Sequence, residues 1–101
     1  MTFGMFGRFT AHDGRRDELL AILLDAARAL EADPGCLLYL VGTSEEPETI
    51  WVQEAWTDEA AHDASLEPEE VRATIARAMP LIAGISDSTR LELHGGKGLP
   101  A

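Results

Sequence analysis

The chain has one cysteine, few basic side chains and no long hydrophobic run, and each shortage excludes a class of protein. Cys36, the lone cysteine, lies in an apolar run without a disulfide partner, so we expect a small buried hydrophobic residue in a reducing compartment. The chain carries 8 Lys and Arg against 18 Asp and Glu, and its formal net charge is −10. This charge repels nucleic acids and anionic lipid surfaces, so we expect neither as a partner.

Signals for export, membrane insertion and common cofactors are also missing. No apolar run approaches the roughly 20 residues that cross a membrane, and the N-terminus lacks the basic region and hydrophobic core of a secretion signal. We therefore expect a cytoplasmic protein. There is no glycine-rich phosphate loop, nucleophile elbow or paired-thiol motif, and His12 and His94 lack neighbours at metal-ligand spacing. The sequence predicts neither a metal site nor a bound cofactor.

Two apolar segments joined by a polar turn, between Pro34 and Trp56, form the centre of the predicted fold. Residues 36–42 are apolar throughout, and residues 50–56 mix β-branched and aromatic side chains with one glutamine and one glutamate. Both compositions are typical of strands. The turn between them contains Pro47, which cannot donate a hydrogen bond to a strand ladder, and several glutamates that repel one another. The pattern predicts a β-hairpin, which needs further elements to be stable in water.

The segments on either side of this hairpin supply those elements. Leucine, isoleucine and alanine recur at helical spacing before it, and Thr57 or Asp58 is the expected N-cap of a short helix after it. Residues 81–88 are expected to be a connection with a turn near Gly84. The remaining predicted elements are strands at 2–9 and 89–94, helices at 15–32 and 57–64, and a helix that starts near Pro68 and is closed by Pro80.

The order strand, helix, strand, strand, helix, strand predicts an α+β fold of the ferredoxin-like βαββαβ type. In this fold one antiparallel sheet carries its helices on one face, because both crossovers are right-handed. We expect residues 1–95 to form a single domain and residues 96–101, rich in glycine, to be a flexible tail.

The predicted hairpin carries large apolar side chains on both of its faces. Tyr39 and Val41 alternate with Leu38 and Leu40, so whichever pair meets the helices, the other lies on the uncovered face of the sheet. A large exposed apolar patch usually marks an interface. We therefore expect a homodimer in which two sheets pack together. The alternative is that loops and the C-terminal tail cover the patch within one chain.

Two short motifs in the hairpin carry a family resemblance. Pro-Gly-Cys enters the second strand, and Glu-Ala-Trp ends the third strand before an acidic, alanine-rich short helix. From about Phe3 to Leu93 the chain resembles the antibiotic biosynthesis monooxygenase family. The resemblance implies a small dimeric α/β barrel, and some members oxygenate quinols and polyketide aromatics without metal or flavin. Such a substrate itself reduces oxygen, so the protein supplies a dry pocket and a base for a phenolic proton.

The resemblance also implies a site. Trp56 matches an aromatic residue that lines the cavity between sheet and helices, and Glu54 shares its side of the strand by alternation. His62 is the candidate base on the short helix, since its ordinary pKa is about 6.5. Tyr39, Phe6 and Met79 are the further substrate-binding residues that we expect.

The match to the family is incomplete in the short helix and the first strand. Members similar to quinol oxygenases have a histidine immediately before the leucine of the short helix, where this chain has Ser65 before Leu66. Haem-degrading relatives have an asparagine on the first strand, where this chain has Gly7, and a haem-ligating histidine in the region of Leu66. We therefore do not expect haem binding.

Two interpretations of the site and of the function stay open. Glu54 and His62 are the predicted catalytic residues, but a salt bridge from Glu54 to Arg8 or Arg72, and a His62 that faces water beside Asp63, are the structural alternatives. The function is then either cofactor-independent oxygenation of a small aromatic or quinol substrate, or binding without chemistry by a dimeric module of the same fold.

Overall fold

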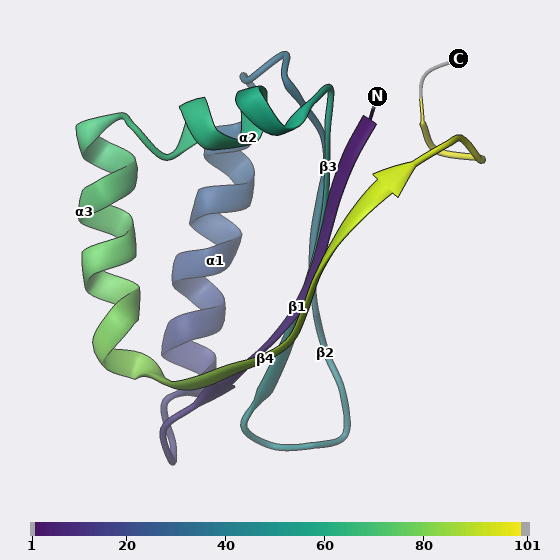
Figure 1. The fold of residues 1–101 in the computed structure, drawn as a ribbon. Coiled ribbons are helices and arrows are strands. Elements are labelled where there is room, and N and C mark those ends of the chain that lie inside the picture. The colour runs from purple at the N-terminus through teal and green to yellow at the C-terminus, as the bar shows by residue number, and fades with distance from the viewer. Residues whose placement is uncertain (1, 100–101) are drawn as a thin grey trace.

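The computed structural model describes residues 2–99 as a four-stranded antiparallel sheet with helices on one face (Figure 1). Met1 and the last two residues of the predicted tail lie outside this range. The predicted ferredoxin-like order is confirmed, with strands in the order β2-β3-β1-β4. The elements are β1 (Thr2–Ala11), α1 (Arg16–Leu30), β2 (Cys36–Thr43), β3 (Thr49–Trp56), α2 (Glu59–Ser65), α3 (Glu69–Ala78), the 3₁₀ turn η1 (Met79–Leu81) and β4 (Ile82–Leu93).

The strand register decides which side chains lie beneath the helices. Met5 of β1 pairs with Glu54 of β3, and Glu54 pairs on its other side with Tyr39 of β2. Directly opposed residues in antiparallel strands share a face. Arg90 of β4 pairs with Met5, so one row of side chains crosses all four strands on the helix-covered face.

The hydrophobic core lies between this face and the helices. Leu19 and Leu23, one turn apart on α1, pack over Ile50 and Val52, which are two residues apart on β3. Ala11, Ala78 and Leu81 complete the buried cluster. Full burial of one such aliphatic side chain contributes about 1.5–3 kcal/mol to folding, so these few contacts hold α1 firmly against the sheet.

A glycine lets α2 approach the start of β2. The Gly35 carbonyl accepts a hydrogen bond from the Thr57 N–H at 2.9 Å, and the Gly35 N–H donates to Asp33 Oδ1 at 2.8 Å. A side-chain carbon at position 35 would lie only 2.9 Å from the Cβ of Ala61 in α2. The Pro-Gly-Cys motif therefore has a packing role, because it joins the hairpin to the helix that follows it.

The last strand is longer than the sequence pattern predicted. The expected connection at residues 81–88 is wrong, because β4 begins at Ile82 and includes Gly84. A register shift interrupts its pairing with β1, and Asp87 adopts a positive φ of 53° there. This bulge hides the alternation of the strand. Arg8 holds the bulge in place, with Nη2 at 3.0 Å from Asp87 Oδ2 and Nε donating to Ser86 Oγ at 3.1 Å.

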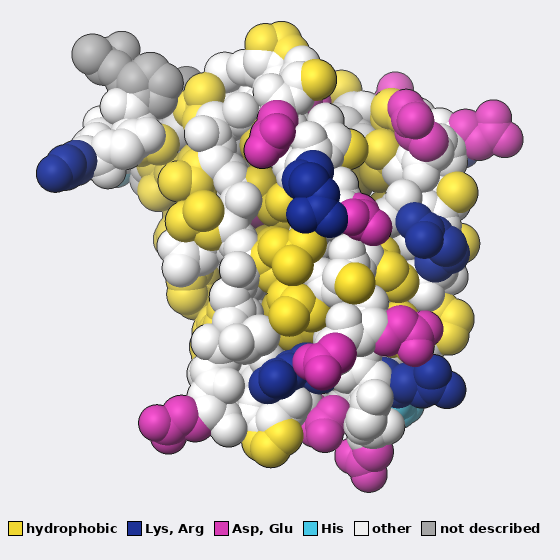
Figure 2. Space-filling model, turned by 180° about the vertical axis from the view of Figure 1, so that it is seen from behind, with side chains coloured by type: hydrophobic (Ala, Val, Ile, Leu, Met, Phe, Trp, Pro, Cys, Tyr) yellow, Lys and Arg dark blue, Asp and Glu magenta, His cyan; other side chains and the backbone are white. Residues whose placement is uncertain are grey.

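The opposite face of the sheet keeps apolar side chains exposed. Leu40 of β2 is 54% exposed and Leu91 of β4 is 43% exposed. Between them the rings of Phe6 and Trp51 lie 5.6 Å apart, and the Arg8 guanidinium stacks 5.4 Å from the Trp51 ring. In the view from behind, hydrophobic side chains follow the sheet margin at the left (Figure 2). The predicted apolar character of both faces is confirmed. None of the helices in residues 2–99 is long and apolar enough to cross a membrane.

Candidate functional site

A carboxyl group, that of Glu54, lies among apolar side chains on the helix-covered face of β3. Its side chain is only 17% exposed. The Trp56 indole donates a hydrogen bond from Nε1 to Glu54 Oε1 at 3.1 Å. Burial raises the pKa of Glu54, while the indole hydrogen bond and the nearby imidazole of His62 partly oppose this rise. Among the described residues, the basic side chain that comes within 4 Å of this carboxyl is His62. Arg8 lies on the other face with Asp87, and within residues 2–99 Arg72 makes no ion pair with Glu54, so the predicted alternative of a salt bridge to Arg8 or Arg72 is wrong.

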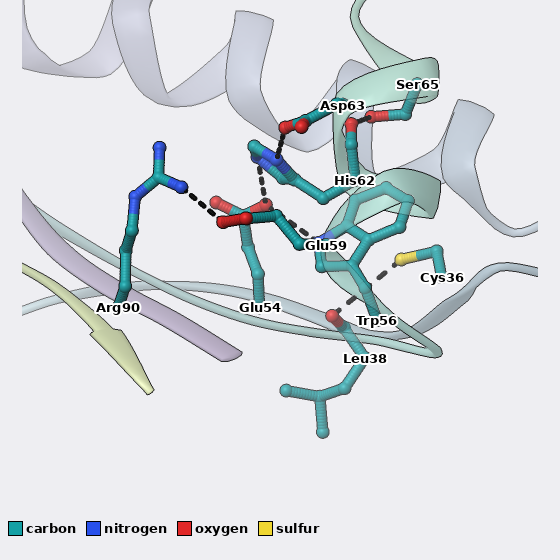
Figure 3. A network of polar contacts seen from close by, with 9 residues as sticks. All are labelled: Cys36, Leu38, Glu54, Trp56, Glu59, His62, Asp63, Ser65 and Arg90. Atoms are coloured by element: carbon teal, nitrogen blue, oxygen red, sulfur yellow. Dashed lines mark hydrogen bonds and ion pairs between the residues drawn. The ribbon is translucent and has the colours of Figure 1, made fainter. Parts of the chain in front are cut away.

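His62 lies on α2 and turns its ring toward the sheet, as Figure 3 shows. The residue is 8% exposed, so the alternative of a water-facing histidine is wrong. Its ring meets Trp56 edge-on at 5.5 Å and Phe3 at 5.4 Å. Its Nε2 lies 3.9 Å from Glu54 Oε1, and its Nδ1 lies 3.0 Å from Asp63 Oδ1. The three residues predicted to share a cavity, Glu54, Trp56 and His62, therefore converge.

Local sequence explains why α2 presents His62 in this way. Asp58 follows Trp56 after one residue and caps the helix, because its Oδ1 accepts a hydrogen bond from the Ala61 N–H at 2.7 Å. At the other end the Ser65 hydroxyl donates to the His62 carbonyl at 2.6 Å. A helix of seven residues fixed at both ends directly after β3 holds its fourth residue above the strand.

The other three predicted site residues lie in different places. Tyr39 joins the cluster as the cross-strand neighbour of Glu54, and burial followed by the Glu54 charge raises the pKa of its hydroxyl. Phe6 lies on the opposite face against Trp51, because strand alternation places Met5 and not Phe6 next to Glu54. Met79 is 56% exposed in η1, at the end of α3 remote from α2. The structure thus brings Tyr39 to the site and leaves Phe6 and Met79 outside it.

Four further residues surround the cluster and were absent from the sequence-based set. Phe3 could have been found by pairing β1 against β3, since it stands opposite Trp56. Asp63 adjoins His62 in the sequence. Arg90 of β4 pairs with Glu59 of α2 at 2.5 Å and lies 5.8 Å from the Phe3 ring. No sequence signal joins these two charges, because they are 31 residues apart.

A groove of about 250 Å³ runs along the β2 side of this cluster, between α1 and β2. Leu24, Ala27 and Leu30 form one wall together with the charged Arg28 and Glu31, and Cys36 and Tyr39 contribute to the other. Cys36 and Tyr39 are the cross-strand neighbours of Trp56 and Glu54. Seen from behind, hydrophobic side chains gather in the middle of the molecule with charged side chains around them (Figure 2).

This arrangement suits proton transfer next to an apolar surface. A buried carboxyl group with a raised pKa and an imidazole can both accept and donate protons. They lie among aromatic rings that exclude water. No set of three His, Cys, Asp or Glu side chains within residues 2–99 is grouped as a metal site.

The raised pKa of Glu54 predicts how stability depends on pH. A carboxyl group with a higher pKa in the folded state favours folding while it is protonated, and this contribution is lost as the pH rises. The loss begins near the ordinary glutamate value of 4.5 and is complete above the folded pKa. Glu54→Gln, which keeps an acceptor for Trp56 but cannot ionise, should therefore gain stability relative to the wild type as the pH rises from acid to neutral.

Urea unfolding followed by tryptophan fluorescence at a series of pH values measures this difference. Glu45→Gln, at an exposed position in the turn between β2 and β3, is the matched control and should show no such trend. A constant difference between Glu54→Gln and the wild type at all pH values would contradict a raised pKa.

Comparison with known proteins places the chain in a family. The model of the family described as antibiotic biosynthesis monooxygenase matches residues 2–77. A solved structure from Chloroflexus aurantiacus, described as a candidate antibiotic biosynthesis monooxygenase, has a TM-score of 0.90 and 36% identity, covering 99% of this chain and 100% of that one. A comparison with curated proteins gives no match.

Two further solved structures share the fold. A protein of unknown function from Nitrosomonas europaea has a TM-score of 0.80 and 28% identity, covering 99% of this chain and 95% of its own. A Caulobacter crescentus structure, also described as a candidate antibiotic biosynthesis monooxygenase, has a TM-score of 0.84 at 22% identity, with 93% of this chain and 91% of that chain covered. Because the family model spans most of the chain, and the Chloroflexus protein matches it over nearly its full length, this chain belongs to the antibiotic biosynthesis monooxygenase family.

Proposed function

We propose that this chain is a cofactor-independent monooxygenase that oxidises a small aromatic or quinol-type substrate. The observation that carries the proposal is the convergence of Glu54 and His62 beside the Trp56 ring, with Nε2 at 3.9 Å from Oε1. Membership of the family supports the reaction class. The groove between α1 and β2 adjoins these groups through Tyr39 and Cys36, the cross-strand neighbours of Glu54 and Trp56, and Leu24, Ala27 and Leu30 give it an apolar part for an aromatic ring.

The reaction needs only a base, an aromatic surface and oxygen. Removal of the phenolic proton by the His62–Glu54 pair makes the ring electron-rich enough to reduce oxygen. One oxygen atom joins an unsubstituted ring carbon and the other leaves as water, so a phenol and O₂ give a quinone and H₂O, and a hydroquinone and O₂ give a hydroxyquinone and H₂O. The substrate supplies both hydrogens and all the electrons, and no further reductant is needed. Exclusion of water by Trp56 and Phe3 strengthens each electrostatic contact during this step.

Oxygen uptake with a panel of hydroquinones and polyhydroxylated aromatics tests this function. Glu54→Gln and His62→Asn should each lower turnover by roughly 10²-fold, since general acid–base groups contribute on that scale. Trp56→Phe keeps an aromatic ring but removes the hydrogen bond to Glu54, and it should chiefly raise KM.

His12→Asn and Glu45→Gln are the controls, because they make the same chemical changes at exposed positions, and both should retain wild-type rates. If the wild type consumes no oxygen with any member of the panel, the chain is a binding module of this fold for those substrates. If uptake is indifferent to Glu54 and His62, the site lies elsewhere.

A homodimer through the uncovered sheet face belongs to the same proposal. Leu40 and Leu91 are about half exposed on that face, and Phe6 and Trp51 lie between them. An apolar surface on an otherwise acidic chain favours association with a second copy, which would bury it. Arg8 also lies on this face, where its guanidinium is paired with Asp87 and stacked on the Trp51 ring within the same chain.

Trp51→Glu should convert the dimer into a monomer. An unpaired carboxylate in a buried apolar contact costs several kcal/mol, which exceeds what an interface of moderate size can absorb. Light scattering at micromolar concentration should report about twice the chain mass for the wild type and for the control Trp51→Phe. A wild type that is monomeric at this concentration would contradict the proposal.

A further inference from the structure

The two ring nitrogens of His62 face two carboxyl groups in different environments. Nδ1 lies 3.0 Å from Oδ1 of Asp63, whose side chain is 64% exposed. Nε2 points the other way, 3.9 Å from Oε1 of Glu54, whose side chain is 17% exposed (Figure 3). The ring lies between these groups and packs against Trp56 and Phe3, with ring centroids 5.5 and 5.4 Å away.

The contact with Asp63 determines where the imidazole hydrogen resides. A carboxylate can only accept hydrogen bonds. A neutral imidazole carries one hydrogen, and the 3.0 Å contact requires it on Nδ1. The lone pair is then on Nε2, directed at the buried side of the site. In the other tautomer Nε2 would carry the hydrogen and could not accept a substrate proton.

We propose that Asp63 is a positioning residue that holds His62 in the Nδ1–H tautomer, so that Nε2 is the proton-accepting atom of the site. The catalytic consequence rests on the proposed function, whereas the tautomer itself does not. The backbone of α2 supports the arrangement, because the Ser65 hydroxyl donates to the His62 carbonyl and Asp58 caps the helix. The charged and titratable groups around the ring are Glu54 and Tyr39 from the sheet, Asp63 and Glu59 from α2, and Arg90 from β4.

The orientation also gives Glu54 a defined role. Its Oε1 already accepts the Trp56 indole hydrogen, so the carboxyl group is oriented before any substrate arrives. A hydroxyl group that enters beside Nε2 can donate its hydrogen to the imidazole and then lies close to the oriented Glu54 carboxyl group. Asp63 lies on the far side of the ring from Glu54 and from the entering hydroxyl group. It therefore acts only through the ring of His62.

Long-range ¹H–¹⁵N NMR of the imidazole nitrogens tests the tautomer directly. At a pH where the ¹⁵N shifts themselves show a neutral ring, His62 should have a protonated Nδ1 and an unprotonated Nε2. His12 and His94 are exposed and serve as references in the same spectrum, where the Nε2–H form of free imidazole should dominate. Asp63→Ala should shift the His62 tautomer ratio about fivefold toward Nε2–H, the scale of one net hydrogen bond.

Two variants separate the hydrogen bond from general effects of charge. Asp63→Asn keeps a carbonyl acceptor for Nδ1–H and should restore much of the wild-type ratio. Glu67→Ala removes one negative charge just beyond α2 and should leave the ratio unchanged. A wild-type His62 in the Nε2–H form, or a ratio that Asp63→Ala does not alter, would overturn the proposal.

Oxygen uptake by the same variants then distinguishes this proposal from the proposed function. Asp63→Ala should lower kcat by about the same factor of five, with KM unchanged and with partial recovery in Asp63→Asn. If the tautomer behaves as expected but no substrate is oxidised, the positioning role stands and the oxygenase function fails. If the wild type is active and Asp63→Ala matches it in both tautomer and kcat, the function stands and the role of Asp63 is refuted.

Discussion

Burial of the Glu54 carboxyl group is the constraint on which the rest of this structure depends. Alternation along β3 sends Ile50, Val52, Glu54 and Trp56 to the same covered face, so a carboxyl group lies in a row that otherwise builds the core. A buried carboxyl group is costly unless neighbours compensate, and here the Trp56 indole and the His62 ring lie against it. Both come from the same short stretch of chain: the end of β3, the Asp58 cap and the first turns of α2.

The same alternation also shapes the opposite face. Trp51 and Gln53 point away from the helices, and Trp51 packs with Phe6 on the surface that we propose as the dimer interface. One strand thus supplies both the candidate site and the candidate interface. A change of register in β3 by one residue would exchange these two sets of side chains. The pairing of β3 with β1 and β2 fixes this register, so it determines both surfaces.

The sequence predicted the order of elements and four of the residues that cluster at the candidate site, and the failures have physical causes. Glu54 and Trp56 follow from period-two alternation, and His62 from its place on the next helix. The prediction that Phe6 lines the site is wrong by one position along β1, because Met5 is the residue that pairs with Glu54. The start of β4 was missed because the bulge at Asp87 breaks its pattern. The pair of Arg90 and Glu59 depends on how β4 and α2 meet in space, which no local pattern reports.

The central claim is that Glu54 and His62 act as one proton-transfer unit, and a double-mutant cycle on oxygen uptake tests it most directly. Turnover is measured for the wild type, Glu54→Gln, His62→Asn and the variant with both changes. Residues that act as a unit give strongly non-additive losses. The account predicts that the double variant is no slower than the slower single variant within about twofold. Losses that multiply, so that the double variant falls by the product of the two single effects, would contradict it.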